Sequence, residues 1–183
     1  SLYESNQDLY LRRAIKASYA RFQGNVMFNG NTELSLDKVV DVIRYFASSK
    51  KVTALYKVKL MKLMWYADFL AFKMRGAAIT GLVYEALPMG AVPVGHNFII
   101  SLKNVPCEEV DMGESNAYRF SLNGYQGIDH LTEEEKVILD IVIEKLGDMN
   151  KNDIIRFMHK EKAYVETAPR EAIDFKYAEY LQI

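Results

Sequence analysis

Residues that build metal centres, disulfides and covalent active sites are scarce in this sequence. One cysteine, Cys107, occurs among 183 residues, and the three histidines, His96, His130 and His159, are widely separated. One cysteine forms neither an internal disulfide nor a cysteine-rich zinc site, and no two histidines have the helical spacing that places both on one metal ion. We therefore expect no metal and no cofactor. We interpret Cys107 as a packing residue, because a nucleophilic thiol needs a neighbouring histidine and an electropositive setting.

Long apolar runs, phosphate-binding glycine loops and internal repeats are also missing. A membrane-spanning helix needs about 20 mostly apolar residues, and a signal peptide needs a basic start before an apolar run; neither pattern occurs. No nucleophile elbow occurs either. We expect a cytoplasmic protein that is not an enzyme. Since the sequence starts at Ser1 without a methionine, we also expect it to be part of a longer protein.

The remaining composition is that of an ordinary globular protein with an uneven distribution of charge. Hydrophobic residues make up 50% and charged residues 26%, with a net charge of −1, which suits one domain or one domain with a helical extension. Residues 44–75 hold eight basic residues and one acid, whereas residues 126–183 hold eight basic and thirteen acidic residues. We expect these two parts to attract each other. Lys59, Lys62 and Lys73 then either form a solvated helix face or meet an acidic partner or nucleic acid.

The clearest helical pattern covers residues 56–75. Apolar residues recur there at the spacing of one helix face, namely Leu60, Leu63, Met64, Ala67, Leu70, Ala71 and Met74. A second apolar stripe that includes Trp65 lies beside the first, so we expect a central helix with Trp65 buried and with its end at Gly76. Asp68 falls inside this second stripe. We interpret Asp68 as a buried carboxylate that accepts backbone N–H bonds from a nearby loop; the alternative is a catalytic acid.

The N-terminal part of the chain carries a moderate helical pattern and then a linker. We expect a helix over residues 2–22 that lies outside the core, followed by a linker over residues 23–33 that is rich in glycine, asparagine and threonine. This linker divides the chain into an N-terminal helix and linker at residues 1–33 and a domain at residues 34–183.

Capping residues and apolar spacing predict the other helices. Ser35 is a candidate N-cap for a helix that ends near residue 48, and Thr132 with Glu135 has the capping-box pattern of a helix that ends at Gly147. Asn150 caps a shorter helix. Two further helices are expected over residues 96–102, with Phe98, Ile99 and Leu102 facing inward, and over residues 170–181, with Ile173, Tyr177, Tyr180 and Leu181 facing inward.

Alternating patterns predict a small amount of antiparallel sheet. Residues 83–87 have the composition of a short strand, after which Pro88, Gly90 and Pro93 are expected to prevent regular structure. Residues 108–122 alternate as a hairpin does, with a turn at residues 113–116. We expect the three strands to form one small sheet. The predicted fold class is α+β, mainly α, with about six helices around the central apolar helix.

Several short motifs resemble one known family. They are K-L-M-W-Y-A-D-F at residues 62–69, I-T-G at 79–81, Y-E-A-L at 84–87, G-A-V-P at 90–93 and Y-A-E-Y-L at 177–181. In this order they resemble the Panacea domain family, also called SocA-like or GepA-like, of bacterial and phage-associated antitoxins. The chain is most similar to the branch whose antitoxins carry a zinc ribbon and a helix-turn-helix ahead of this domain. Ala91 departs from the proline that many members have at this turn, whereas His159 matches a histidine that the family usually has.

The resemblance implies an antitoxin domain that binds a cognate toxin protein and either masks the toxin or presents it to a protease. A AAA+ protease is then a further partner, DNA is contacted only through an N-terminal region that precedes this chain, a homodimer is left open, and no membrane is involved. Two other functions remain as alternatives. One is a nucleic-acid-binding transcriptional regulator that uses the basic residues of 12–21 and 59–73, and the other is a hydrolase that uses Asp68 with His96 or His159.

We predict that the partner binds at the apolar turn of residues 89–96 and at an exposed edge of the central helix beside it. Pro93 with Gly90 and Gly95 in this turn, and Pro88 directly before it, are expected to hold it stiff, which lowers the ordering cost of binding. The alternative is that the turn fills the domain's own core. The predicted partner-binding residues are Lys62, Tyr66, Lys73, Met89, Gly90, Pro93 and His96.

Overall fold

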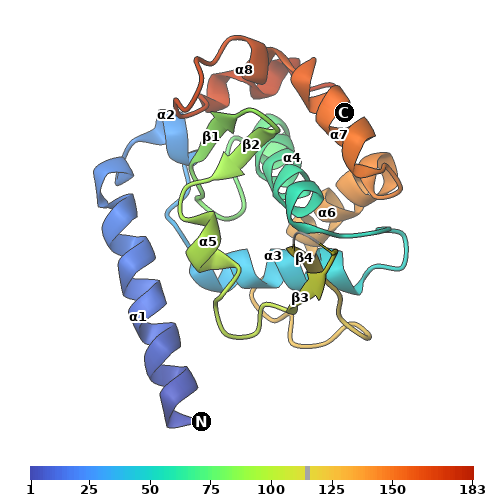
Figure 1. Cartoon of the computed structure of the whole chain (residues 1–183). Coiled ribbons are helices and arrows are strands. Elements are labelled where there is room, and N and C mark those ends of the chain that lie inside the picture. The colour runs from blue at the N-terminus through green and yellow to red at the C-terminus, as the bar shows by residue number, and fades with distance from the viewer. Residues whose placement is uncertain (114–115) are drawn as a thin grey trace.

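The computed structural model describes residues 1–113 and 116–183, with side chains except that of residue 116. Figure 1 shows helices packed around α4, two short hairpins, and an N-terminal helix that extends away from the body. The fold is α+β and mainly α, as predicted. No helix in the described residues is both long and apolar enough to cross a membrane. In chain order the elements are α1 (Leu2–Tyr19), η1 (Ala20–Phe22), α2 (Val26–Asn29), α3 (Leu36–Ser48), α4 (Lys57–Arg75), β1 (Tyr84–Leu87), β2 (Gly90–Pro93), α5 (His96–Ile99), β3 (Cys107–Asp111), β4 (Asn116–Phe120), α6 (Glu133–Leu146), α7 (Lys151–His159), α8 (Lys162–Val165) and η2 (Phe175–Tyr180).

Helix α4 is the central element of the core. It is buried continuously from Lys59 to Ala71, and it contacts α3, α6, α7, β2, β4 and η2. A helix that is apolar on two adjoining sides must be covered on both, which the surrounding elements do. The helix ends at Gly76, whose φ of 77° lies in the left-handed region that a C-terminal cap requires. The predicted bounds and central position of this helix are confirmed.

The predicted capping residues begin their helices as expected. The Ser35 side chain accepts a hydrogen bond from the backbone of Lys38 at the start of α3. Thr132 and Glu135 form a reciprocal capping box at the start of α6. Asn150 caps α7 by accepting from the backbone of Asp153. These local side chains satisfy N–H groups that the first helical turn leaves without partners.

The sheet differs from the prediction. Strands β1 and β2 pair antiparallel from Tyr84↔Pro93 to Leu87↔Gly90, so the expectation that residues 88–93 lack regular structure is wrong. The prolines are compatible with this hairpin because Pro88 lies in the turn and Pro93 ends the strand. The predicted single three-stranded sheet is also wrong, because β3 and β4 form a separate hairpin.

The β3–β4 hairpin itself is confirmed, with its register running from Cys107↔Phe120 to Asp111↔Asn116. Its predicted turn at 113–116 lies partly outside the described residues, since 114–115 are not described.

The N-terminal helix is partly embedded in the core. Residues 1–7 are exposed, but Leu11, Ile15 and Tyr19 are buried. The Tyr19 hydroxyl donates to the carbonyl of Val94 over 2.8 Å, which ties the end of α1 to the hairpin. The expectation that this helix lies outside the core is therefore wrong for its C-terminal half. The division of the chain at residue 33 stays a prediction.

Two predicted helices are shorter than expected. Residues 96–102 form only the single turn α5, in which Ile99 is buried while Phe98 is 46% exposed. Residues 170–181 form only the 3-10 helix η2, with Tyr180 45% exposed. The start of this segment is extended because it bonds to β1: the N–H of Arg170 donates to Ala86, and that of Ile173 donates to Tyr84. This pairing between distant segments prevents a helix there.

Replacing Trp65 by alanine is expected to lower the free energy of unfolding by about 3–5 kcal/mol, because it leaves a cavity in the core. The indole is fully buried and stacks on Phe69 with 4.4 Å between ring centroids. Tyr10→Ala is the control: Tyr10 is 69% exposed on α1, so its loss is expected to change stability by less than about 0.5 kcal/mol. Urea unfolding followed by circular dichroism measures both. Equal effects of the two substitutions would contradict the central position of α4.

Candidate protein-binding site

The site begins with a carboxylate on α4 that fixes the segment leading to the hairpin. Asp68 is fully buried, and its Oδ1 accepts backbone N–H bonds from Ile79 and Thr80, both over 2.9 Å. Its Oδ2 accepts the hydroxyls of Thr80 over 2.6 Å and of Tyr84 over 2.7 Å. Burial raises the pKa of Asp68, and the four donors oppose that rise by stabilising the carboxylate. Asp68 is thus the buried, loop-binding carboxylate that was predicted. Through its bond to Tyr84 it also fixes the start of β1.

Lys62 on α4 binds β2, the second strand of the hairpin. Its Nζ donates to the carbonyl of Ala91 over 2.8 Å, and it forms no ion pair with a carboxylate of the described residues. Burial therefore lowers the pKa of Lys62 to about 7. The lysine fits because Gly90 has no side chain: a Cβ there would lie 2.6 Å from both Lys62 Cε and Met158 Sδ. The φ of Gly90, 114°, also favours glycine. Lys62 and Gly90 therefore form one close contact between α4 and β2.

Side chains from α7 and α8 hold the turn of the hairpin. The hydroxyl of Tyr164 donates to the carbonyl of Leu87 over 2.6 Å, and Nε2 of His159 lies 3.0 Å from the carbonyl of Pro88. Because a carbonyl only accepts, this Nε2 carries the proton. The His159 and Tyr164 rings stack, with 4.7 Å between their centroids. Met89 remains at the tip of this braced turn with 48% of its surface exposed.

A groove of about 480 Å³ lies beside the turn, between the hairpin and the C-terminal segment. It is lined by Ala86, Leu87, Pro88, His159, Tyr164, Val165, Thr167, Pro169 and Arg170. Tyr164, Val165 and Arg170 were not predicted from the sequence. Residues 161–167 have no clear apolar periodicity, and the segment after them was expected to be helical. Pro169 lies between the two segments, and a proline at this position indicates that the chain is not helical there.

The predicted partner-binding residues do not form one surface. Lys62 and Tyr66 are buried, so the predicted exposed edge of α4 is wrong at both positions. Their long side chains reach inward because Lys62 finds a carbonyl partner and the Tyr66 ring packs 5.9 Å from that of Phe157. Lys73 is exposed, but its Nζ donates to the carbonyl of Leu181, away from the turn.

The remaining predicted residues divide between the two ends of the hairpin. Met89 and Gly90 lie at the turn, whereas Pro93 and His96 lie at the opposite end. Gly90 and Pro93 are buried, and His96 is half-buried. Burial and the charges of Lys57 and Lys62 lower the pKa of His96. Of the predicted set, only Met89 lies exposed at the tip of the turn.

Neither a metal centre nor the proposed hydrolase pair is assembled in the described residues. No group of three or more histidine, cysteine or acidic side chains in these residues could hold a metal ion. Asp68 is fully buried with its oxygens occupied by four donors, so it cannot reach a substrate. Cys107 is half-buried, and burial raises the pKa of its thiol, which makes it a poorer nucleophile.

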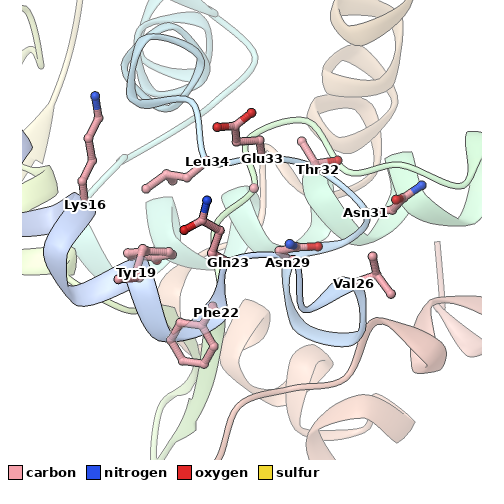
Figure 2. Close-up of a pocket in the computed structure, with 13 residues that line it drawn as sticks. Lys16, Tyr19, Phe22, Gln23, Val26, Asn29, Asn31, Thr32, Glu33 and Leu34 are labelled. Carbon is pink, nitrogen blue, oxygen red and sulfur yellow. The ribbon is translucent and has the colours of Figure 1, made fainter.

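A second cleft, of about 680 Å³, lies where α1 joins the domain. Figure 2 shows Gln23, Asn29, Glu33 and Leu34 facing it, with Lys16 at one side. Its lining mixes one cation, one carboxylate, three amides and several apolar side chains, which do not converge on one point. We take the groove beside the hairpin as the candidate site instead, because it adjoins the turn that carries the exposed Met89.

The comparison with protein families matches the chain to the family model described as Antitoxin SocA-like, Panacea domain, over residues 60–164. The chain belongs to this family. No curated protein and no solved structure matches it. The match covers four side chains that hold the hairpin and the segment before it, namely Lys62, Asp68, His159 and Tyr164. It ends one residue before Val165, so α1, Arg170 and η2 lie outside it.

Lys62 is expected to make stability depend on pH. The folded-state pKa is about 7 and the ordinary value is 10.5, so the unfolded chain binds more protons between these values. The contribution of Lys62 to the free energy of unfolding therefore rises with pH from about 7 towards 10, by at most about 1.4 kcal/mol per pH unit. Below pH 7 the cost of a buried charged amine is fully present.

Lys62→Met removes this titration, so wild type is expected to gain stability relative to the variant as pH rises through this window. Urea unfolding at pH 7, 8, 9 and 10 measures the difference. Lys50→Met, at an exposed lysine, is the matched control and is expected to keep the wild-type slope. Parallel pH profiles for wild type and Lys62→Met would contradict the burial of this amine.

Proposed function

We propose that this Panacea domain neutralises a cognate toxin by direct protein–protein binding, and that the toxin contacts the hairpin turn at Met89. The observation that supports this most is an exposed methionine on a turn whose two carbonyls, of Leu87 and Pro88, are held by Tyr164 and His159. A rigid turn loses little conformational freedom when it binds, so more of its contact energy appears as affinity.

The chemistry of the tip suits a protein partner. Met89 is a flexible apolar side chain of the kind enriched in interface cores, and Val165 on the other side of the groove is 65% exposed. Exposed apolar side chains that flank a concave surface are compatible with a site that binds a protein segment. Neutralisation by masking or by presentation to a AAA+ protease would both use such a contact.

Two α4 lysines that nucleic-acid binding would need on a basic surface are not exposed. Lys59 and Lys62 are buried, and the Nζ of Lys59 donates to the carbonyl of Gly147 over 2.6 Å, so neither can reach a phosphate. On α1, Arg12 pairs with Asp8 and Asp37. These internal contacts argue against nucleic-acid binding through Lys59, Lys62 and Arg12.

Met89→Asp is expected to abolish rescue of growth when the chain is co-expressed with the product of the adjacent open reading frame, because a carboxylate at the tip would be buried unpaired in the complex. Co-purification of the two proteins measures binding directly. Met112→Asp is the matched control, since Met112 is 58% exposed on the other hairpin. It is expected to leave rescue and co-purification intact.

Circular dichroism and the unfolding midpoint establish that both variants fold. A folded Met89→Asp variant that still rescues growth would overturn the placement of the interface at the turn. Absence of any rescue or binding by the unaltered chain would overturn the proposed function for this pair of proteins.

A further inference from the structure

Among the described residues, one permanently charged side chain lines the groove beside the hairpin. This side chain is that of Arg170, and no carboxylate of the described residues lines the groove. Arg170 is exposed, and its guanidinium makes no hydrogen bond or ion pair within the described part of the chain. Glu166 and Glu171 are near in sequence but do not line the groove. A cation is therefore presented to this concavity without an internal partner.

Each of the other polar side chains that line the groove already makes a hydrogen bond within the described residues. The carbonyls of Leu87 and Pro88 accept from Tyr164 and His159, and the hydroxyl of Thr167 donates to the carbonyl of Ala163 over 2.6 Å. The rest of the lining is aliphatic or aromatic carbon. Polar recognition in the groove thus depends on Arg170, while Pro88 and Val165 offer apolar contact.

Arg170 is also held in a backbone conformation that its side chain disfavours. Its φ is 67°, in the left-handed region, where glycine is the favoured residue. The conformation is maintained by β1, because the Arg170 N–H donates to Ala86 over 2.7 Å and the Ala86 N–H donates to Glu171 over 3.1 Å. Strained residues that the surroundings hold in place occur preferentially at binding and catalytic sites.

We infer that this groove binds a short segment of the partner toxin in which an apolar side chain stands next to a carboxylate, and that Arg170 binds the carboxylate. The inference rests on the proposed function and names the chemistry that the toxin must present. A volume of about 480 Å³ accommodates two or three side chains, not a folded element. A planar guanidinium binds a carboxylate through two parallel hydrogen bonds, which fixes orientation as well as charge.

Calorimetric titration of the full chain with the purified product of the adjacent reading frame tests the charge. Arg170→Glu is expected to weaken binding by about tenfold or more, since it replaces a charge-assisted hydrogen bond by repulsion. Arg13→Glu is the matched control, because Arg13 is exposed on α1 and does not line the groove. It is expected to leave the affinity within about twofold of wild type.

Arg170→Gly separates binding from folding. Glycine adopts the observed backbone without strain, so this variant is expected to unfold at or above the wild-type midpoint and yet to lose binding as Arg170→Glu does. Val165→Asp, with Val137→Asp as its equally apolar and exposed control at 56%, tests the apolar half of the groove in the same way.

The carboxylate can belong to the end of the toxin chain or to an acidic side chain. Adding Gly-Ser to the C-terminus of the toxin distinguishes the two. Loss of binding by the extended toxin identifies a chain-end carboxylate, and unchanged binding identifies an acidic side chain. Wild-type affinity in both Arg170 variants would overturn the inference while leaving the proposed function intact. No binding by the unaltered chain would instead be a failure of the proposed function.

Discussion

The hydrogen bonds that α4 makes through its buried polar side chains determine how the rest of this chain is arranged. Asp68 binds the segment that leaves the helix, and Lys62 binds the returning strand of the hairpin. Either group would cost several kcal/mol if buried without partners, so each enforces the backbone position that satisfies it. The apolar faces of α4 supply most of the burial, but apolar contact alone tolerates many registers. The directional bonds specify which loop and which strand cover the helix.

The same helix explains why a basic segment does not form a basic surface. Lys59 and Lys62 direct their amines to backbone carbonyls. Arg75 pairs with Glu134 and Glu135, which is part of the attraction expected between the basic and acidic halves of the chain. A buried lysine that donates to a carbonyl loses its proton more readily than one in an ion pair, because no opposite charge offsets its desolvation. The charge of this segment therefore serves internal assembly.

The sequence predicted those features that depend on neighbouring residues. The bounds of α4, the capping box of Thr132 and Glu135 and the loop-binding role of Asp68 all follow from spacing or from the cost of burying a charge. The pairing of β1 with β2 was missed because proline and glycine weaken the sequence pattern of a strand. In the structure, Lys62 packs against Gly90 and stabilises the strand that the pattern does not predict. The burial of Lys62 and Tyr66 was missed because a long polar side chain is expected at the surface until its partner is known. Arg170 was missed because its conformation depends on a strand more than eighty residues earlier in the chain.

The two walls of the groove differ in how they relate to the family. The wall formed by the hairpin, His159 and Tyr164 lies within the residues that match the Panacea model, and its backbone is fixed by buried groups of α4. The opposite wall lies outside that match: Val165 is the last residue of α8, and Arg170 is joined to β1 by main-chain bonds. The main-chain bonds at Arg170 do not depend on its side chain, so this side chain can change without disturbing the hairpin. In the proposed complex with the toxin, the hairpin wall is the rigid part of the site, and the side chains of the other wall set which partner is accepted.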